Sequence, residues 1–108
     1  MEKSKYQKEV RKDIWNLDYS FLEWLYVRCK AYKDILGDII DLDYYVISYK
    51  GKKYTQAKAL DLIIKYVGYY LQKNDASEFK SLEDENNALK NVQFACHLWA
   101  EILPFMWY

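Results

Sequence analysis

The last stretch of the chain, Ser81 to Tyr108, constrains the fold more than any other part of the sequence. Apolar residues recur there at steps of three and four, which is the spacing of one face of an α-helix. They fall on two neighbouring faces, the first with Leu89, Val92, Cys96, Trp99 and Leu103 and the second with Phe94, Ala95, Leu98 and Ile102. Because a helix that is apolar on most sides must be covered on most sides, we expect it in the centre of a bundle or against a partner.

The ends of this helix are also marked in the sequence. Ser81, followed three residues later by Asp84, resembles a capping box, and the acidic residues 83–85 suit the positive end of the helix dipole. Pro104 disfavours helical geometry at Leu103 and predicts the end of the helix there.

Four large apolar residues complete the chain, and leaving them in water costs about 25 cal/mol per Å² of apolar surface. We expect them to dock either onto the chain's own core or at an interface between subunits, and the sequence leaves both alternatives open. The interface candidates are Trp99, Ile102, Phe105, Met106, Trp107 and Tyr108.

The length of 108 residues predicts a single domain, residues 1–108. The 16 basic residues balance the 16 acidic ones, which argues against a general nucleic-acid binder and against an acidic mimic of DNA. Twelve tyrosines and four tryptophans favour a binding protein, because these side chains are enriched at interfaces and stacking sites. The partner that we expect first is another copy of the same chain, in a homo-oligomer.

The chain shows no segment that predicts a membrane or an export signal. Its longest apolar run, Asn91 to Ala100, is too short to span a bilayer, and the charged N-terminus is not followed by an apolar segment. We therefore expect a soluble, cytoplasmic protein. Cys29 and Cys96 both lie in apolar helical stretches, which is typical of reduced core cysteines.

The fold class predicted is mainly α, a small helical domain of three to four helices with one β-hairpin, in the order α-α-β-β-α-α. The expected helices are 2–14, 21–36, 56–73 and 81–103, with the hairpin inserted near 42–54. Ser20 with Glu23 predicts the start of the second helix, and Lys50-Gly51 the turn of the hairpin. The alternative is an α+β domain with a third strand near 39–42.

Two further features predict local structure in and before the third helix. Thr55 is expected to cap that helix, and Gly68 inside it indicates the close approach of a neighbouring helix. The acidic residues Asp34, Asp38, Asp41 and Asp43 do not have the spacing or the glycine of a calcium loop. We expect them to pair with lysines or to cap a turn, and we predict no metal and no cofactor.

A basic, tyrosine-flanked segment runs from the hairpin into the third helix. Lysines gather at the positive end of that helix, where free backbone N–H groups can bind an anion, and the tyrosines are able to stack on a base. The sequence therefore offers an anion or nucleotide site, against the alternative of a solvated basic turn. The candidate residues are Tyr49, Lys50, Lys52, Lys53, Tyr54, Thr55 and Lys58.

The only histidine, His97, follows Cys96 on the last helix, where adjacent side chains point about 100° apart. Such a pair is a poor catalytic or metal-binding unit, so His97 is interpreted as a structural histidine. The sequence also has no phosphate-binding glycine loop and no nucleophile elbow. We predict that the protein is not an enzyme.

Three stretches together carry a resemblance: Leu17 to Tyr26, Tyr49 to Thr55 and Leu98 to Tyr108. They resemble small, largely uncharacterised proteins encoded by phages and prophages of Gram-positive bacteria. The resemblance implies an accessory protein made in the bacterial cytoplasm that acts by binding, and it transfers no catalytic residue.

Three functions are compatible with these observations. The first is a non-enzymatic oligomer that modulates a host or anti-phage defence protein. The second is a protein that sequesters an anionic nucleotide, such as a cyclic nucleotide immune signal, in the site lined by lysines and tyrosines. The third, disfavoured by the zero net charge, is nucleic-acid binding through the first helix and the hairpin.

Overall fold

The computed structural model describes residues 17–76 and 78–106, and it confirms a mainly helical fold with one hairpin. The predicted helix 2–14 lies outside the described residues, and residues 39–42 form turns and bends instead of the alternative third strand. Within the described ranges, no helix has the length and apolarity that crossing a membrane requires. The elements are α2 (Leu17–Leu36), β1 (Val46–Tyr49), β2 (Lys52–Thr55), α3 (Gln56–Ala76), α4 (Leu82–Ile102) and the 3₁₀ turn η1 (Leu103–Phe105).

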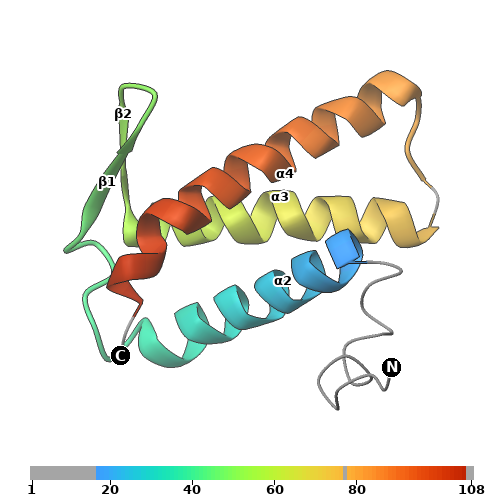
Figure 1. Cartoon of the computed structure of the whole chain (residues 1–108). Helices are drawn as coiled ribbons and strands as arrows, with labels where there is room; N and C mark the ends of the chain where they lie inside the picture. The colour runs from blue at the N-terminus through green and yellow to red at the C-terminus, as the bar shows by residue number, and fades with distance from the viewer. Residues whose placement is uncertain (1–16, 77, 107–108) are drawn as a thin grey trace, which may run out of the picture.

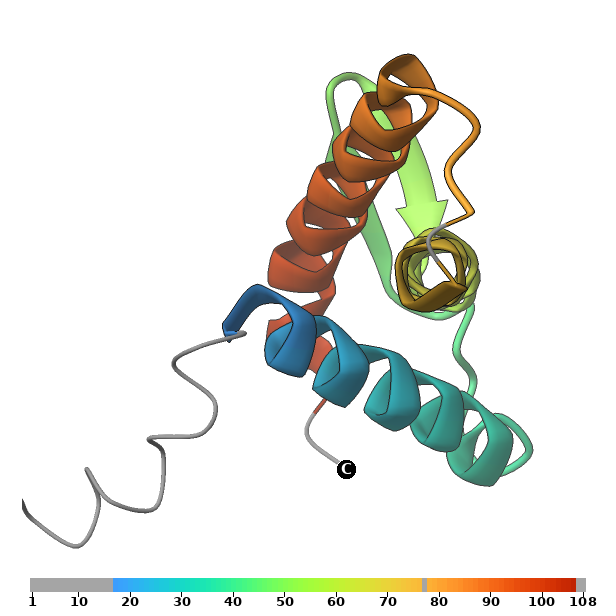
Figure 2. The same ribbon diagram turned by 90° about the vertical axis from the view of Figure 1, so that its right-hand side faces the viewer.

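Helix α3 is the central element of the fold. Helices α2 and α4 pack on different sides of it, and the hairpin stands beside the C-terminal half of α4 (Figures 1 and 2). The side chains that are completely buried come from all three helices, among them Leu25, Leu60, Ile63, Leu98 and Ile102. Helix α4 is therefore covered by α3 and by the hairpin, which together bury part of its apolar surface.

The face that α4 presents to the core differs from the predicted one. Its buried residues are Ala88, Val92, Ala95, Leu98 and Ile102, a row that lies between the two predicted faces. Leu89 and Leu103, which belong to the first of the two predicted faces, are exposed by 38% and 50%. Two alanines in the buried row, Ala88 and Ala95, leave room for α3 to approach.

The contact between α2 and α3 confirms the interpretation of Gly68. A Cβ atom at that position would lie 2.8 Å from Cε2 of the Tyr26 ring on α2, which is closer than such atoms pack. At the other end of the same contact, the hydroxyl of Tyr19 donates to both carboxylate oxygens of Asp75, at 2.8 and 2.9 Å. This hydrogen bond raises the pKa of Tyr19. The absence of a side chain at Gly68 therefore allows α2 and α3 to pack closely.

Two of the three predicted helix starts are confirmed. The hydroxyl of Thr55 accepts from the N–H of Lys58 at 3.1 Å, and the hydroxyl of Ser81 accepts from the N–H of Asp84 at 3.1 Å. The prediction for Ser20 is wrong because α2 already begins at Leu17, so that Ser20 lies inside its first turn. A serine three residues before a glutamate is a weak signal when the preceding residues also continue the helix.

Both cysteines are free, as predicted. Cys29 is buried, and its burial raises the pKa of the thiol to about 12. Cys96 is partly buried, and its pKa is raised for the same reason. Both thiols are therefore protonated at neutral pH.

Candidate functional site

The hairpin is closed by a two-residue turn in which both residues have positive φ, 49° at Lys50 and 79° at Gly51. Such a turn matches the twist of the two strands and fixes their register. Tyr49 pairs with Lys52, and Ile47 pairs with Tyr54. The predicted turn is thus confirmed, and it determines which side chains share a face.

Because successive residues of a strand point to opposite faces, the hairpin divides the basic segment in two. The inner face, with Ile47, Tyr49, Lys52 and Tyr54, is turned toward α4. Ile47 is only 5% exposed there. The outer face carries Val46, Ser48, Lys53 and Thr55.

A cleft of about 540 Å³ lies between the inner face of the hairpin and α4. Three lysine ammonium groups border it, two from the hairpin and one from α4, and none of the residues that line it carries a carboxylate. The cleft therefore has a positive potential that its own walls do not neutralise. The lining residues are Tyr49, Lys50, Lys52, Tyr54, Lys90, Gln93, Phe94 and His97.

Aromatic rings form one wall of this basic cleft. The Tyr49 ring stacks on His97, with centroids 5.2 Å apart and an angle of 23° between the planes. The ring centroid of Phe94 lies 5.7 Å from that of Tyr49 and 6.0 Å from that of Tyr54. The ammonium of Lys50 lies 5.5 Å from the centre of the Tyr49 ring, a cation–π distance. Flat aromatic surface and positive charge thus meet in one place.

The start of α3, by contrast, has no free N–H group for an anion among its first three residues. The N–H of Gln56 donates to the carbonyl of Tyr45 at 3.0 Å, and that of Ala57 donates to the carbonyl of Leu42 at 2.8 Å. The third N–H, of Lys58, is taken by the hydroxyl of Thr55. These backbone donors, on which the prediction of an anion site at this helix end relied, are therefore used by the chain itself.

The seven candidate residues of the basic segment therefore fall into two groups, those that line the cleft and those that do not. Four of them, Tyr49, Lys50, Lys52 and Tyr54, line the cleft. The other three are not among its lining residues: Lys53 and Thr55 belong to the outer face, and Lys58 belongs to the first turn of α3.

The sequence interpretation missed the half of the cleft that α4 supplies. Lys90, Gln93, Phe94 and His97 follow one another at steps of three, one and three, which places them on one face of the helix. His97 is exposed, and its ring stacks on that of Tyr49 at the wall of the cleft. The helical spacing was visible in the sequence, but its pairing with a distant hairpin was not.

The acidic segment after α2 forms turns. The carboxylate of Asp41 accepts from the N–H of Asp43 at 2.9 Å, which confirms that this residue caps a turn. Across residues 17–76 and 78–106, no three His, Cys, Asp or Glu side chains gather in a way that would hold a metal ion.

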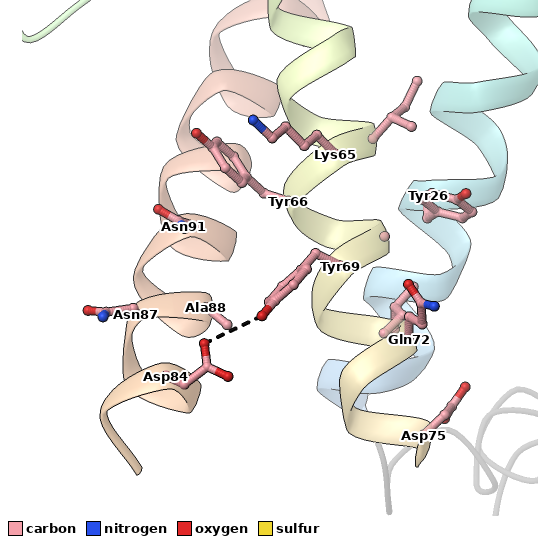
Figure 3. A pocket seen from close by; sticks show the side chains of 13 residues that line it. Tyr26, Lys65, Tyr66, Tyr69, Gln72, Asp75, Asp84, Asn87, Ala88 and Asn91 are labelled. Atoms are coloured by element: carbon pink, nitrogen blue, oxygen red, sulfur yellow. Dashed lines mark hydrogen bonds between the residues drawn. The ribbon is translucent and has the colours of Figure 1, made fainter. Parts of the chain in front are cut away.

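Helices α3 and α4 diverge toward the loop that joins them (Figure 1), and a larger hollow of about 730 Å³ lies there (Figure 3). Tyr69 of α3 points across it toward Asp84 of α4, and the two side chains are joined by a long hydrogen bond of 3.4 Å. Its walls carry two carboxylates, Asp75 and Asp84, against one lysine, Lys65. The walls of this hollow therefore do not have the excess of positive charge that the walls of the hairpin cleft have.

The predicted interface residues lie in different environments. Ile102 is completely buried in the core, so its assignment to an interface is corrected. Phe105 and Met106 are half-buried and pack against the same core, and Phe105 stacks on Tyr45 at 4.5 Å. Trp99 is half-buried and meets the edge of Trp24 on α2 at 6.3 Å. Trp107 and Tyr108 lie outside the described residues.

Comparison with known proteins adds no relative: no protein-family model, curated protein or solved structure matches the chain. The fold and the cleft therefore define its class by themselves. It is a small helical domain in which a β-hairpin and the last helix enclose a basic cleft with an aromatic wall.

Proposed function

We propose that the protein is a non-enzymatic binding protein, and that the cleft between the hairpin and α4 holds a small anionic ligand with a planar ring. The observation that carries this proposal is the union of three lysines, three aromatic residues and a histidine in one cleft without an acidic wall residue. A nucleotide has the matching chemistry, since its phosphate pairs with ammonium groups and its base stacks on aromatic rings.

The geometry supports each half of this ligand separately. Lys50 in the turn and Lys52 at the start of β2 stand at the tip of the hairpin, and Lys90 stands on the opposite wall, so a phosphate between them meets positive charge from the hairpin and from α4. The exposed His97 ring, already stacked on Tyr49, offers its other side to a base. The cleft volume of about 540 Å³ falls within the range of small-molecule sites, roughly 300–1,000 Å³.

The resemblance to phage-encoded proteins suggests the ligands to try first, namely the cyclic nucleotides that serve as immune signals. In that setting the protein acts by sequestering the signal.

The test is calorimetry with adenosine monophosphate and a panel of cyclic nucleotides, with adenosine and inorganic phosphate as the two half-ligands. We expect one nucleotide to bind more tightly than either half. Lys52→Glu should weaken that binding at least about tenfold, which is about 1.4 kcal/mol. The matched control is Lys53→Glu, the neighbouring lysine on the outer face, which should change it less than about threefold because solvent screens charges beyond about 8 Å. Equal losses in the two variants, or no binding at all, would contradict the proposal.

A second candidate function rests on a separate observation, an aromatic row on the outer surface of α2. Phe21 and Trp24 are exposed by 41% and 43%, their rings stack 6.4 Å apart, and Trp24 continues the row to Trp99 on α4. The guanidinium of Arg28 lies 4.8 Å from the centre of the Trp24 ring. Tryptophan and arginine dominate the energetics of protein interfaces. We propose that this row joins two copies of the chain, and that such an oligomer acts on a host or defence protein.

Native mass spectrometry tests the second candidate. Trp24→Glu should convert an oligomer into a monomer, because the charge would be buried in the contact. Tyr44→Glu, at an aromatic residue that is 73% exposed but is not part of the row, should leave the oligomeric state unchanged. A wild-type protein that is monomeric at micromolar concentration would rule the oligomer out and leave the cleft proposal untouched.

A further inference from the structure

The outer edge of β1 is a free strand edge at one end of the molecule (Figure 1). In a hairpin with a two-residue turn, the pair that flanks the turn is hydrogen-bonded across the strands, which here is Tyr49 with Lys52. Bonded and non-bonded pairs then alternate along an antiparallel ladder. The backbone N–H and C=O groups of Val46 and Ser48 therefore point away from β2.

No other described segment covers this edge with backbone groups. The N–H of Gln56 donates to the carbonyl of Tyr45, which continues the alternation beyond the strands. Among the turn, loop and cap hydrogen bonds of residues 17–76 and 78–106, none involves the backbone of Val46 or Ser48. The side chain of Val46 is 53% exposed, and Ser48 is exposed as well. The edge therefore offers unpaired donors and acceptors to a further strand.

The two strands of the hairpin differ in how their edges are protected. Lysines on an edge strand disfavour pairing with another chain, and β2 carries Lys52 and Lys53. The sequence of β1 is Val-Ile-Ser-Tyr, without a charge. Its β-branched and aromatic residues are those that favour a strand. Of the two edges, that of β1 is therefore the one at which a further strand can add.

Charges at the two ends of β1 indicate the direction of such a strand. Asp41 and Asp43 precede β1, Lys50 follows it in the turn, and all three are exposed. An antiparallel partner places its first residues beside Lys50 and its last residues beside the two aspartates. A segment with acidic residues before its centre and basic residues after it then meets opposite charges at both ends, which stabilises the pairing.

The size of the edge indicates an extended segment of another protein rather than a second copy of this chain. The four residues of β1 span only about 13 Å. A stable pair of globular chains buries roughly 800 Å² on each partner, far more than such a short edge supplies. An extended segment that adds to a sheet gains its affinity from main-chain hydrogen bonds instead.

We propose that β1 binds an extended segment of a partner protein as a third, antiparallel strand. The segment has an uncharged, β-branched centre, with acidic residues before it and basic residues after it. The backbone of Val46 and Ser48 holds it, and Lys50 and Asp43 set its direction. Apart from Lys50, this surface shares no residue with the basic cleft or the row on α2, so its failure would leave both proposed functions untouched.

The probe is a capped peptide with two glutamates, five residues of alternating valine and threonine, and two lysines. A control peptide has the glutamates and the lysines exchanged. Hydrogen exchange of the labelled protein should slow at least about tenfold at the amides of Val46 and Ser48 when the probe saturates the edge. The amide of Lys53, which faces the free edge of β2, should not change. The control peptide should bind at least about threefold less tightly.

A matched pair of variants separates the two edges. Ser48 and Lys53 face each other in a pair that is not hydrogen-bonded, so proline at either position removes an outward donor and no bond of the hairpin. Ser48→Pro should weaken binding of the probe at least about tenfold, and Lys53→Pro less than about threefold. Asp43→Lys keeps the backbone intact, and it should weaken the probe and strengthen the control peptide, which decides the matter if Ser48→Pro does not fold.

Three results would overturn the proposal. The first is equal loss of binding in the two proline variants, and the second is no binding of the probe at millimolar concentration. The third is slow exchange at Val46 and Ser48 without any peptide, increasing with protein concentration, because the edge would then pair with a second copy of the chain.

Discussion

The inner face of the hairpin and the first turn of α3 are neighbours in the sequence, and both carry lysines, but they differ in what they offer an anion. On the inner face, Lys52 borders an open cleft whose opposite wall adds Lys90. In the first turn of α3, the N–H groups of residues 56–58 already donate to the chain itself. We infer that a basic segment can bind an anion only where its donors are left unused and a second element faces them.

The largest expected effect concerns the apolar anchor that holds the inner face against α4. Ile47→Ala should lower the free energy of unfolding by about 2–4 kcal/mol, because Ile47 is 5% exposed and its loss leaves a cavity. Val46→Ala, on the outer face at 53% exposure, should cost about 0.5 kcal/mol or less. Urea denaturation followed by circular dichroism measures both. Similar losses in the two variants would mean that the hairpin does not pack as described.

The next effect concerns the turn that positions Lys50 and Lys52. Gly51 has a φ of 79°, and a Cβ there would meet nothing within 4 Å. Gly51→Ala should therefore cost about 1–2 kcal/mol from backbone strain alone. Lys50→Asn, at a φ of 49°, should be neutral or slightly stabilising because asparagine tolerates this region. Denaturation curves of the two variants separate strain from contacts, and an unchanged stability of Gly51→Ala would contradict the turn geometry.

A smaller effect tests the role of the outer face. Thr55→Ala removes the side-chain cap of α3 and should cost about 1 kcal/mol of stability. It should leave nucleotide affinity unchanged, because Thr55 does not line the cleft. Calorimetry and denaturation of the one variant give both numbers. A large loss of nucleotide affinity would instead indicate that the binding site lies at the start of α3.

The smallest expected effect is a gain in stability rather than a loss. Lys58→Glu exchanges an unfavourable cation in the first turn of α3 for a favourable anion, so stability should rise by about 0.3–1 kcal/mol. Nucleotide affinity should change less than about threefold. A denaturation midpoint below that of the wild type would indicate that Lys58 makes a contact that the structure does not show.

The parts of the fold that were predictable are those set by local rules. The hairpin turn at Lys50-Gly51, the caps at Thr55 and Ser81 and the close contact at Gly68 each follow from a short sequence signal. The start of α2 was predicted wrongly because the pattern around Ser20 also continues a helix.

The cleft was predictable only in part. Tyr49 and Lys52 were found because they stand in one basic segment, whereas Lys90 and His97 lie about forty residues further on. Their approach depends on how the hairpin packs on α4, which no local pattern encodes. Strand alternation places Lys52 and Lys53 on opposite faces, and the same packing decides that the face with Lys52 is the one turned toward α4.

The most direct test of the cleft is a map of amide chemical shifts during titration with the nucleotide that binds best in calorimetry. We expect the largest shifts in two separate segments, residues 49–54 of the hairpin and residues 90–97 of α4, with small shifts at residues 56–58. The largest shifts at residues 56–58, without a response from α4, would contradict it and would place the anion at the start of α3.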